Sequence, residues 1–151
     1  MVYNRHSIVI FIPLHMHMKQ IEHIGIAVRN LQEACEVYER LLGVAPYKTE
    51  EVVSEGVLTA FFKSGPNKIE LLQATTKQSA IAQFIEKKGE GMHHIAFAVD
   101  DIQAEMKRLK GEGFTLLNEA PKRGADNKWI CFVHPKDANG VLVELCQEIN
   151  S

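Results

Sequence analysis

An internal repeat restricts the possible folds of this chain more than any other feature of its sequence. The segment EHIGIAVRNL (22–31) aligns without gaps on HHIAFAVDDI (93–102), and this alignment pairs His23 with His94. Each segment has the alternating pattern of a β-strand and leads into a helical pattern. The chain is therefore expected to contain one structural unit twice.

A second pair of matching segments lies at the far end of each copy. The segment IELLQ (69–73) aligns on VELCQ (143–147), and this alignment pairs Glu70 with Glu144. Each copy thus begins with a strand that carries a histidine and ends with a strand that carries a glutamate. These duplicated positions are the first candidates for a shared functional site.

Each copy is predicted to contain one strand, one helix and three further strands. In the first copy, Asn30 can cap a helix that ends at Gly43. In the second copy, Asp101 is the expected cap, and Gly111 and Gly113 are the expected stop. The strand patterns lie at 21–28, 47–54, 57–63 and 68–73 in the first copy and, after its opening strand, near 114–118, 129–133 and 141–147 in the second.

This order of elements predicts an α+β fold of two tandem βαβββ modules, at about 20–75 and 91–149. The segment SAIAQFIEKKG (79–89) begins with a serine cap and has helical apolar spacing, so we expect a short linking helix. The modules together fit a single domain at 18–151. Residues 1–17 are interpreted as an N-terminal extension without function, with an extra strand as the alternative.

Composition and charge exclude several classes of partner. A formal net charge of −2 offers no positive field for nucleic acid. The apolar stretch at 8–14 is far shorter than the roughly 20 residues that a membrane helix needs. Three cysteines at scattered positions (Cys35, Cys131 and Cys146) suggest neither a disulfide framework nor a cysteine zinc site, and favour a reducing cytoplasm.

Strand alternation separates a packed face from a hollow one. His23 shares its face with Gly25 and Ala27, while large branched residues point to the other side. The second copy repeats the pattern, because small residues at alternate positions also follow His94. Small residues beside a histidine leave space above the sheet in which a ligand could sit.

The same alternation directs Glu70 and Glu144 toward the hollow face and assigns His93 to the opposite face, with a structural role. Two imidazoles and two carboxylates on one face suit a divalent cation such as zinc, cobalt, nickel or manganese. The alternative is that these residues, His23 and His94 included, are ordinary polar side chains at strand ends. Duplication of both positions favours the metal site.

At these positions the chain resembles the vicinal oxygen chelate superfamily and, within it, the methylmalonyl-CoA epimerase family. The resemblance covers residues 20–149 and is carried by GEGMHHIAFAVDDI (89–102), EAPKRGADNKWICFVHPKDANGVLVELCQ (119–147) and NKIELL (67–72). It implies that the two modules form a cupped mixed sheet around one divalent metal. By resemblance, the metal ligands are His23, Glu70, His94 and Glu144.

The resemblance also implies a reaction and a substrate. The family interconverts (2R)- and (2S)-methylmalonyl-CoA by removing and returning a proton at C2 through a metal-stabilised enolate. Glu144 is the expected acid/base, and Glu70 is a candidate for the second one, because Thr59 stands where some members carry a further glutamate. Positive charge near the last strands is expected to bind the coenzyme A phosphates, at Lys122, Arg123 and Lys136.

Other functions within the superfamily remain open at this point. A lactoylglutathione lyase would use the same four ligands and a similar proton transfer. A non-catalytic member would bind a small molecule in the cup without turnover. The resemblance also implies a homodimer, whereas neither nucleic acid nor a membrane is an expected partner.

Overall fold

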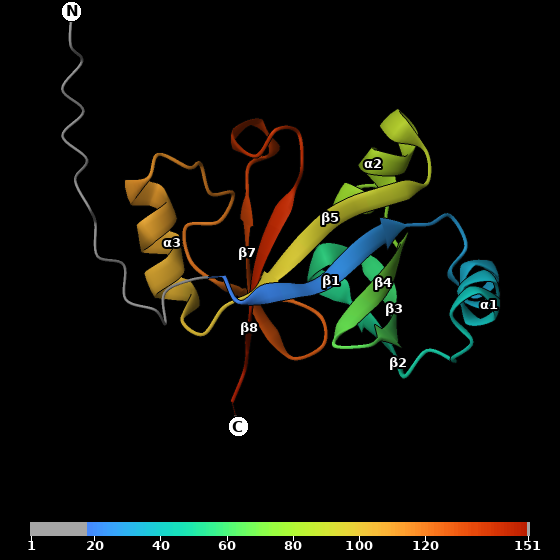
Figure 1. Cartoon of the computed structure of the whole chain (residues 1–151). Helices are drawn as coiled ribbons and strands as arrows, with labels where there is room; N and C mark the ends of the chain where they lie inside the picture. Colours follow the sequence, from blue (N-terminus) through green and yellow to red (C-terminus); the bar gives the residue numbers. More distant parts are fainter. Residues whose placement is uncertain (1–17, 151) are drawn as a thin grey trace, which may run out of the picture.

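The computed structural model describes residues 18–150, in which eight strands form one curled sheet (Figure 1). The proposed extension at 1–17 lies outside the described residues. The strand order is β2-β3-β4-β1-β5-β8-β7-β6. The first module contains β1 (Gln20–Ala27), α1 (Leu31–Leu42), β2 (Lys48–Val52), β3 (Val57–Ser64) and β4 (Asn67–Ala74). The second contains β5 (Gly91–Ala98), α3 (Ile102–Gly111), β6 (Lys122–Arg123), β7 (Lys128–Val133) and β8 (Val143–Glu148), and α2 (Ala80–Lys88) links the two.

The sheet is mixed and has the symmetry that the repeat predicts. Within each module the first and last strands pair in parallel, β1 with β4 and β5 with β8, and the modules join through the antiparallel pair β1–β5. The α+β fold of two βαβββ modules in a cupped mixed sheet is therefore confirmed. No helix within residues 18–150 has the length and apolar character needed to cross a membrane.

The large apolar side chains pack beneath the helices, as strand alternation predicts. Figure 1 shows α1 and α3 at opposite ends of the sheet, α1 beside β3 and β4 and α3 beside β7 and β8. Leu71 is fully buried in the cluster that contains Leu31 of α1, and Leu145 is fully buried in the cluster that contains Ile102 of α3. The opposite face of the sheet is thus free to form a cavity.

The predicted helix caps are present, and a glutamine at the end of each copy supports them. The side chains of Asn30, Ser79 and Asp101 accept hydrogen bonds from the first turns of α1, α2 and α3. Gln73 accepts a hydrogen bond from the Leu31 N–H at 2.6 Å, and Gln147 accepts one from the Ile102 N–H at 2.8 Å. The last strand of each module therefore also holds the start of its helix.

We expect Gln147→Leu to destabilise the protein by about 1 kcal/mol, because the buried end of α3 loses an acceptor for its first N–H. Urea unfolding of the metal-free protein measures the change. Gln103→Leu is the control, since Gln103 lies on an exposed position of α3. Equal stability of Gln147→Leu and the control would show that water replaces the glutamine without cost.

The strand predicted at 114–118 does not form. Only Leu116 makes a bridge, with Val133, and β6 occupies the sheet edge instead. Two backbone hydrogen bonds still join the segment to the end of β7, from the Leu117 N–H to the Phe132 carbonyl and from the His134 N–H to the Thr115 carbonyl, both at 2.8 Å. Side chains supply further bonds: the Asp137 carboxylate accepts the Thr115 N–H at 2.6 Å, and the Asn118 side chain accepts the Phe132 N–H at 2.9 Å. Each of these side-chain bonds pairs a backbone N–H that a regular ladder would pair with a carbonyl oxygen.

Two β-bulges interrupt the central strand pair. Between the pairs Ile21↔Phe97 and His23↔Ala96, Glu22 has no partner on β5. Farther along, the pairs move from Gly25↔His94 to Ile26↔Met92, so His93 has no partner on β1. Each bulge residue directly precedes a predicted ligand histidine, and a bulge changes the direction of nearby side chains.

Candidate metal centre

The four predicted ligands meet at one point above the central strands β4, β1, β5 and β8. The Nε2 atoms of His23 and His94 are 3.0 Å apart. Glu70 Oε2 lies 3.2 Å from His23 Nε2 and 3.4 Å from His94 Nε2. The Glu144 carboxylate reaches within 3.4 Å of His94 Nε2 and 3.8 Å of His23 Nε2. Each module therefore contributes one histidine and one glutamate.

The sheet register explains this convergence. Glu70 of β4 is opposite Gly25 of β1, and Glu144 of β8 is opposite Ala96 of β5. Gly25 is also opposite His94, and a Cβ atom built on Gly25 would overlap the His94 ring. The small residues do more than leave empty space: the ring of the partner histidine occupies the position above Gly25.

Burial and opposite charges govern the protonation of the site. Burial disfavours a charged imidazole, but the neighbouring carboxylates, led by Glu22, outweigh it and raise the pKa of His23 to about 10. Burial raises the pKa of Glu144. Although burial also opposes ionisation of Glu70, hydrogen bonds from the two histidines lower its pKa to about 2. The carboxylates of this site therefore require nearby positive charge.

The donor set fits a divalent cation. Glu22, Glu55 and Asp126 of the cavity wall pair with lysines, whereas among the described residues Glu70 and Glu144 have only the two histidines as ion-pair partners. Around a metal bound at 2.0–2.1 Å, neighbouring donor atoms stand about 3 Å apart, which is close to the separations observed here. A cation bound to neutral histidines would supply the charge that the buried carboxylates need.

The assignment of His93 to the opposite face is wrong. Both His93 and Glu22 line the cavity, because each is the extra residue of a β-bulge. The Glu22 carboxylate accepts a hydrogen bond from His23 Nδ1, and His93 Nδ1 lies 2.9 Å from His94 Nδ1. Each ligand histidine is therefore oriented by the residue before it, as outer partners commonly orient metal-binding imidazoles.

A second cluster around Glu22 does not have the character of a metal site. The donor atoms of Glu22, His23 and Cys146 lie close enough to suit an ion. Burial, however, raises the pKa of the Cys146 thiol, so the sulfur keeps its proton. Glu22 is also neutralised by the Lys68 ammonium group.

The four side chains line a cavity of about 320 Å³. The wall also includes apolar residues of both modules and of α2, such as Val57, Leu117 and Ile81, and the loop at 124–126. A volume in this range accommodates a small acyl group. The nucleotide end of a coenzyme A thioester would have to extend outside the cavity.

The three predicted phosphate-binding cations occupy different places. Lys122 lines the cavity and pairs with Glu55 at 2.5 Å. Arg123, the next residue of β6, is exposed and stacks over Trp129, 5.8 Å from its ring centre. Lys136 is exposed in a short 3-10 helix (Pro135–Asp137) away from the cavity lining. The structure therefore brings only Lys122 to the site.

Thr59 faces the cavity and provides no carboxylate there. It is buried, lines the cavity wall and donates its hydroxyl hydrogen to the Glu50 carbonyl oxygen at 3.3 Å. The residue that sequence reasoning missed is Glu22, because strict alternation assigns it to the packed face. Its identity as an acid directly before a ligand histidine is the signal that could have suggested its role.

Comparison with known proteins identifies the class. The model of the Glyoxalase/Bleomycin resistance protein/Dioxygenase superfamily matches residues 22–132. The chain belongs to this superfamily, and the sequence resemblance is confirmed.

Its relatives include methylmalonyl-CoA epimerases. The ethylmalonyl-CoA/methylmalonyl-CoA epimerase of Cereibacter sphaeroides is 41% identical over 85% of this chain and 97% of its own length. The human mitochondrial methylmalonyl-CoA epimerase is 39% identical over 87% of this chain and 75% of its own length. A variant of the Streptomyces coelicolor methylmalonyl-CoA epimerase, in complex with 2-nitronate-propionyl-CoA, superposes with a TM-score of 0.85 at 36% identity, covering 87% of this chain and 96% of that one.

Proposed function

We propose that this protein is a metal-dependent epimerase that interconverts (2R)- and (2S)-methylmalonyl-CoA. The observation that carries the proposal is the convergence of two histidines and two glutamates in a cavity that suits an acyl group. The epimerase relatives supply the substrate class. A divalent cation held by His23, Glu70, His94 and Glu144 would supply Lewis-acid stabilisation of negative charge on the thioester oxygen.

The two glutamates are suited to exchange a proton on opposite faces of C2. In the sheet order, β4 with Glu70 and β8 with Glu144 flank the central pair β1–β5 from opposite sides. Inversion at C2 requires one group that removes the proton and another that returns one to the other face of the enolate. Glu144 is proposed as one acid/base and Glu70 as the other, since Thr59 cannot accept a proton at neutral pH.

Of the three predicted phosphate-binding cations, Lys122 is the one proposed to bind substrate from within the cavity. Lys122 lines the cavity, so its ammonium group can meet a phosphate once it leaves Glu55. Arg123 and Lys136 could contact only those parts of coenzyme A that lie outside the cavity. Exclusion of water from the acyl end is supported by the apolar wall.

Hydrogen exchange in deuterated water tests the proposed activity. Protein loaded with cobalt(II) is expected to exchange the C2 hydrogen of methylmalonyl-CoA, followed by proton NMR, about 100-fold faster than metal-stripped protein or more. Turnover of the glutathione–methylglyoxal adduct in place of exchange would support a lactoylglutathione lyase. Absence of both activities would support a non-catalytic binding protein.

The proposed assembly is a homodimer in a reducing compartment such as the cytoplasm. Cys35, Cys131 and Cys146 are free thiols among the described residues, and two of them are buried. The molar mass measured by light scattering as the protein elutes from a size-exclusion column distinguishes a dimer from a monomer.

A further inference from the structure

A chain of charged side chains connects a loop of the second module to the metal site of the first. The loop at 124–127, between β6 and β7, places Asp126 against β2 and β4 of the first module. The Asp126 carboxylate accepts hydrogen bonds from Tyr47 Oη at 2.8 Å and from Lys68 Nζ at 2.9 Å. The backbone N–H of Asp126 donates to the Glu50 carboxylate at 2.8 Å. The loop is thus anchored across the module boundary.

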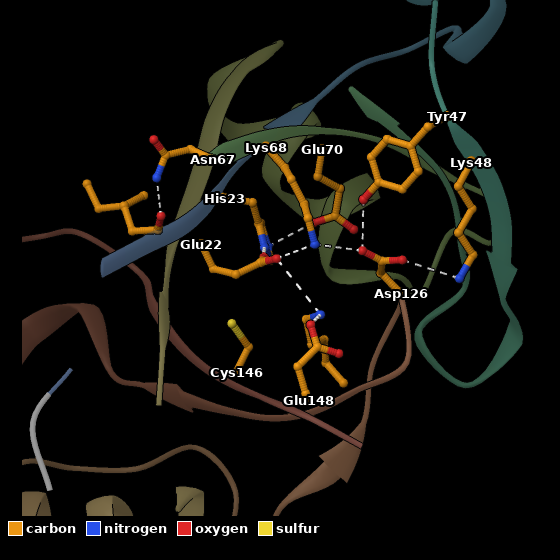
Figure 2. A network of polar contacts seen from close by, with 12 residues as sticks. Glu22, His23, Tyr47, Lys48, Asn67, Lys68, Glu70, Asp126, Cys146 and Glu148 are labelled. Carbon is orange, nitrogen blue, oxygen red and sulfur yellow. Dashed lines mark hydrogen bonds and ion pairs between the residues drawn. The ribbon is translucent and has the colours of Figure 1, made fainter. Parts of the chain in front are cut away.

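Lys68 continues the chain of contacts toward the ligands. Its ammonium group donates both to Asp126 and to Glu22, and Glu22 in turn accepts the hydrogen bond from His23 Nδ1 (Figure 2). Figure 2 shows Lys68 and Glu22 between Asp126 and the His23 ring. Negative and positive groups therefore alternate from the loop to the histidine.

These contacts are shielded from water. The side chains of Lys68, Asp126 and Glu22 are 21%, 18% and 11% exposed, whereas the surface pair Lys19–Asp100 is 59% and 49% exposed. Partly buried charges are screened far less than surface charges, so each one constrains the position of the next. The loop also forms part of the cavity wall through Gly124, Ala125 and Asp126.

The second module lacks this arrangement. In the repeat, His93 occupies the position of Glu22, and Leu142 occupies the position of Lys68. His94 therefore meets another imidazole, while His23 alone is held by a charged chain of contacts that reaches the cavity wall. The asymmetry indicates a role that the repeat itself does not require.

We propose that Asp126, Lys68 and Glu22 are positioning residues that couple the loop at 124–127 to cation binding at His23. This inference rests on the proposed metal site. A cation that draws His23 into one orientation also fixes Glu22, Lys68 and the loop. If the bound cation strengthens the binding of a substrate that orders the loop, that substrate strengthens cation binding by the same factor, because coupling between two binding sites is reciprocal.

Two measurements on the full chain test the coupling. Zinc affinity is measured by competition with a chromophoric chelator, and amide hydrogen exchange of the loop is followed with and without zinc. In the wild type, zinc is expected to slow exchange at Asp126. Lys68→Met is expected to weaken zinc binding about 10- to 100-fold and to abolish the effect of zinc on the loop.

Matched variants separate positioning from general damage. Lys68→Arg is expected to restore most of the affinity, Asp126→Asn to reproduce the loss without removing a large side chain, and Lys19→Met, which breaks the surface ion pair, to have no effect. A wild type that binds no zinc would overturn the proposed metal site and this coupling with it. Tight zinc binding by the wild type, Lys68→Met and Asp126→Asn alike would overturn the coupling alone.

Discussion

Glu144→Gln is expected to lower C2 hydrogen exchange by about 100- to 10,000-fold for the epimer of methylmalonyl-CoA whose C2 hydrogen faces Glu144, because an amide of the same shape cannot carry a proton to or from carbon. Exchange of the other epimer, which faces Glu70, and interconversion of the two are distinguished by following each epimer separately. The amide oxygen can still face a cation, so the variant should remain folded and should bind cobalt at raised concentrations. The measurement is proton NMR in deuterated water with cobalt at saturation, alongside the cobalt content of the protein.

Glu86→Gln provides the control for this loss. Glu86 is an exposed residue of α2 outside the cavity lining, and its substitution removes the same charge from the chain. It should exchange hydrogen at the wild-type rate. Retention of more than a tenth of the wild-type exchange rate for both epimers by cobalt-saturated Glu144→Gln would exclude Glu144 as a proton carrier.

Gly25→Ala should damage the metal site more than its single methyl group suggests. The added Cβ would overlap the His94 ring, so the ring must move away from the point where the four donors meet. A displacement of about 1 Å can cost about 100-fold in rate. We expect a loss of that size in exchange, together with weaker cobalt binding and an altered visible spectrum of the bound cobalt.

Gly111→Ala is the matched control, because nothing lies near the position of its Cβ at the end of α3. It should leave cobalt binding and exchange unchanged. Wild-type cobalt affinity in Gly25→Ala would mean that His94 has no fixed position above Gly25, and the geometric argument for the ligand set would fail.

The repeat accounts for most of what could be predicted from sequence. Alternation over short strands selects His23 and His94, and the matching glutamates follow from the same register. Alternation fails where a strand contains an extra residue, and both failures occur beside the site, at Glu22 and His93. Bulges depend on contacts across the sheet, so one strand read alone does not reveal them.

The edge of the second module was predicted less well for a related reason. Segment 114–118 has a strand-like pattern, but the Asp137 side chain takes its Thr115 N–H, and the side chain of Asn118 takes the Phe132 N–H of β7. Similarly, adjacent residues of β6 lie on opposite faces, so a basic pair in the sequence gives only one cavity residue, Lys122. The role of Asp126 depends on the other module and has no local signal.

The order of the ligand-bearing strands along the chain determines when the site can form during synthesis. His23, Glu70 and His94 leave the ribosome well before Glu144, which is on the last strand. The donor set becomes complete only after β8 pairs with β5, and such long-range pairing is slow compared with local folding. A cation therefore meets all four ligands only after β8 has joined the sheet. Because it binds the folded state alone, it makes the last step of folding harder to reverse.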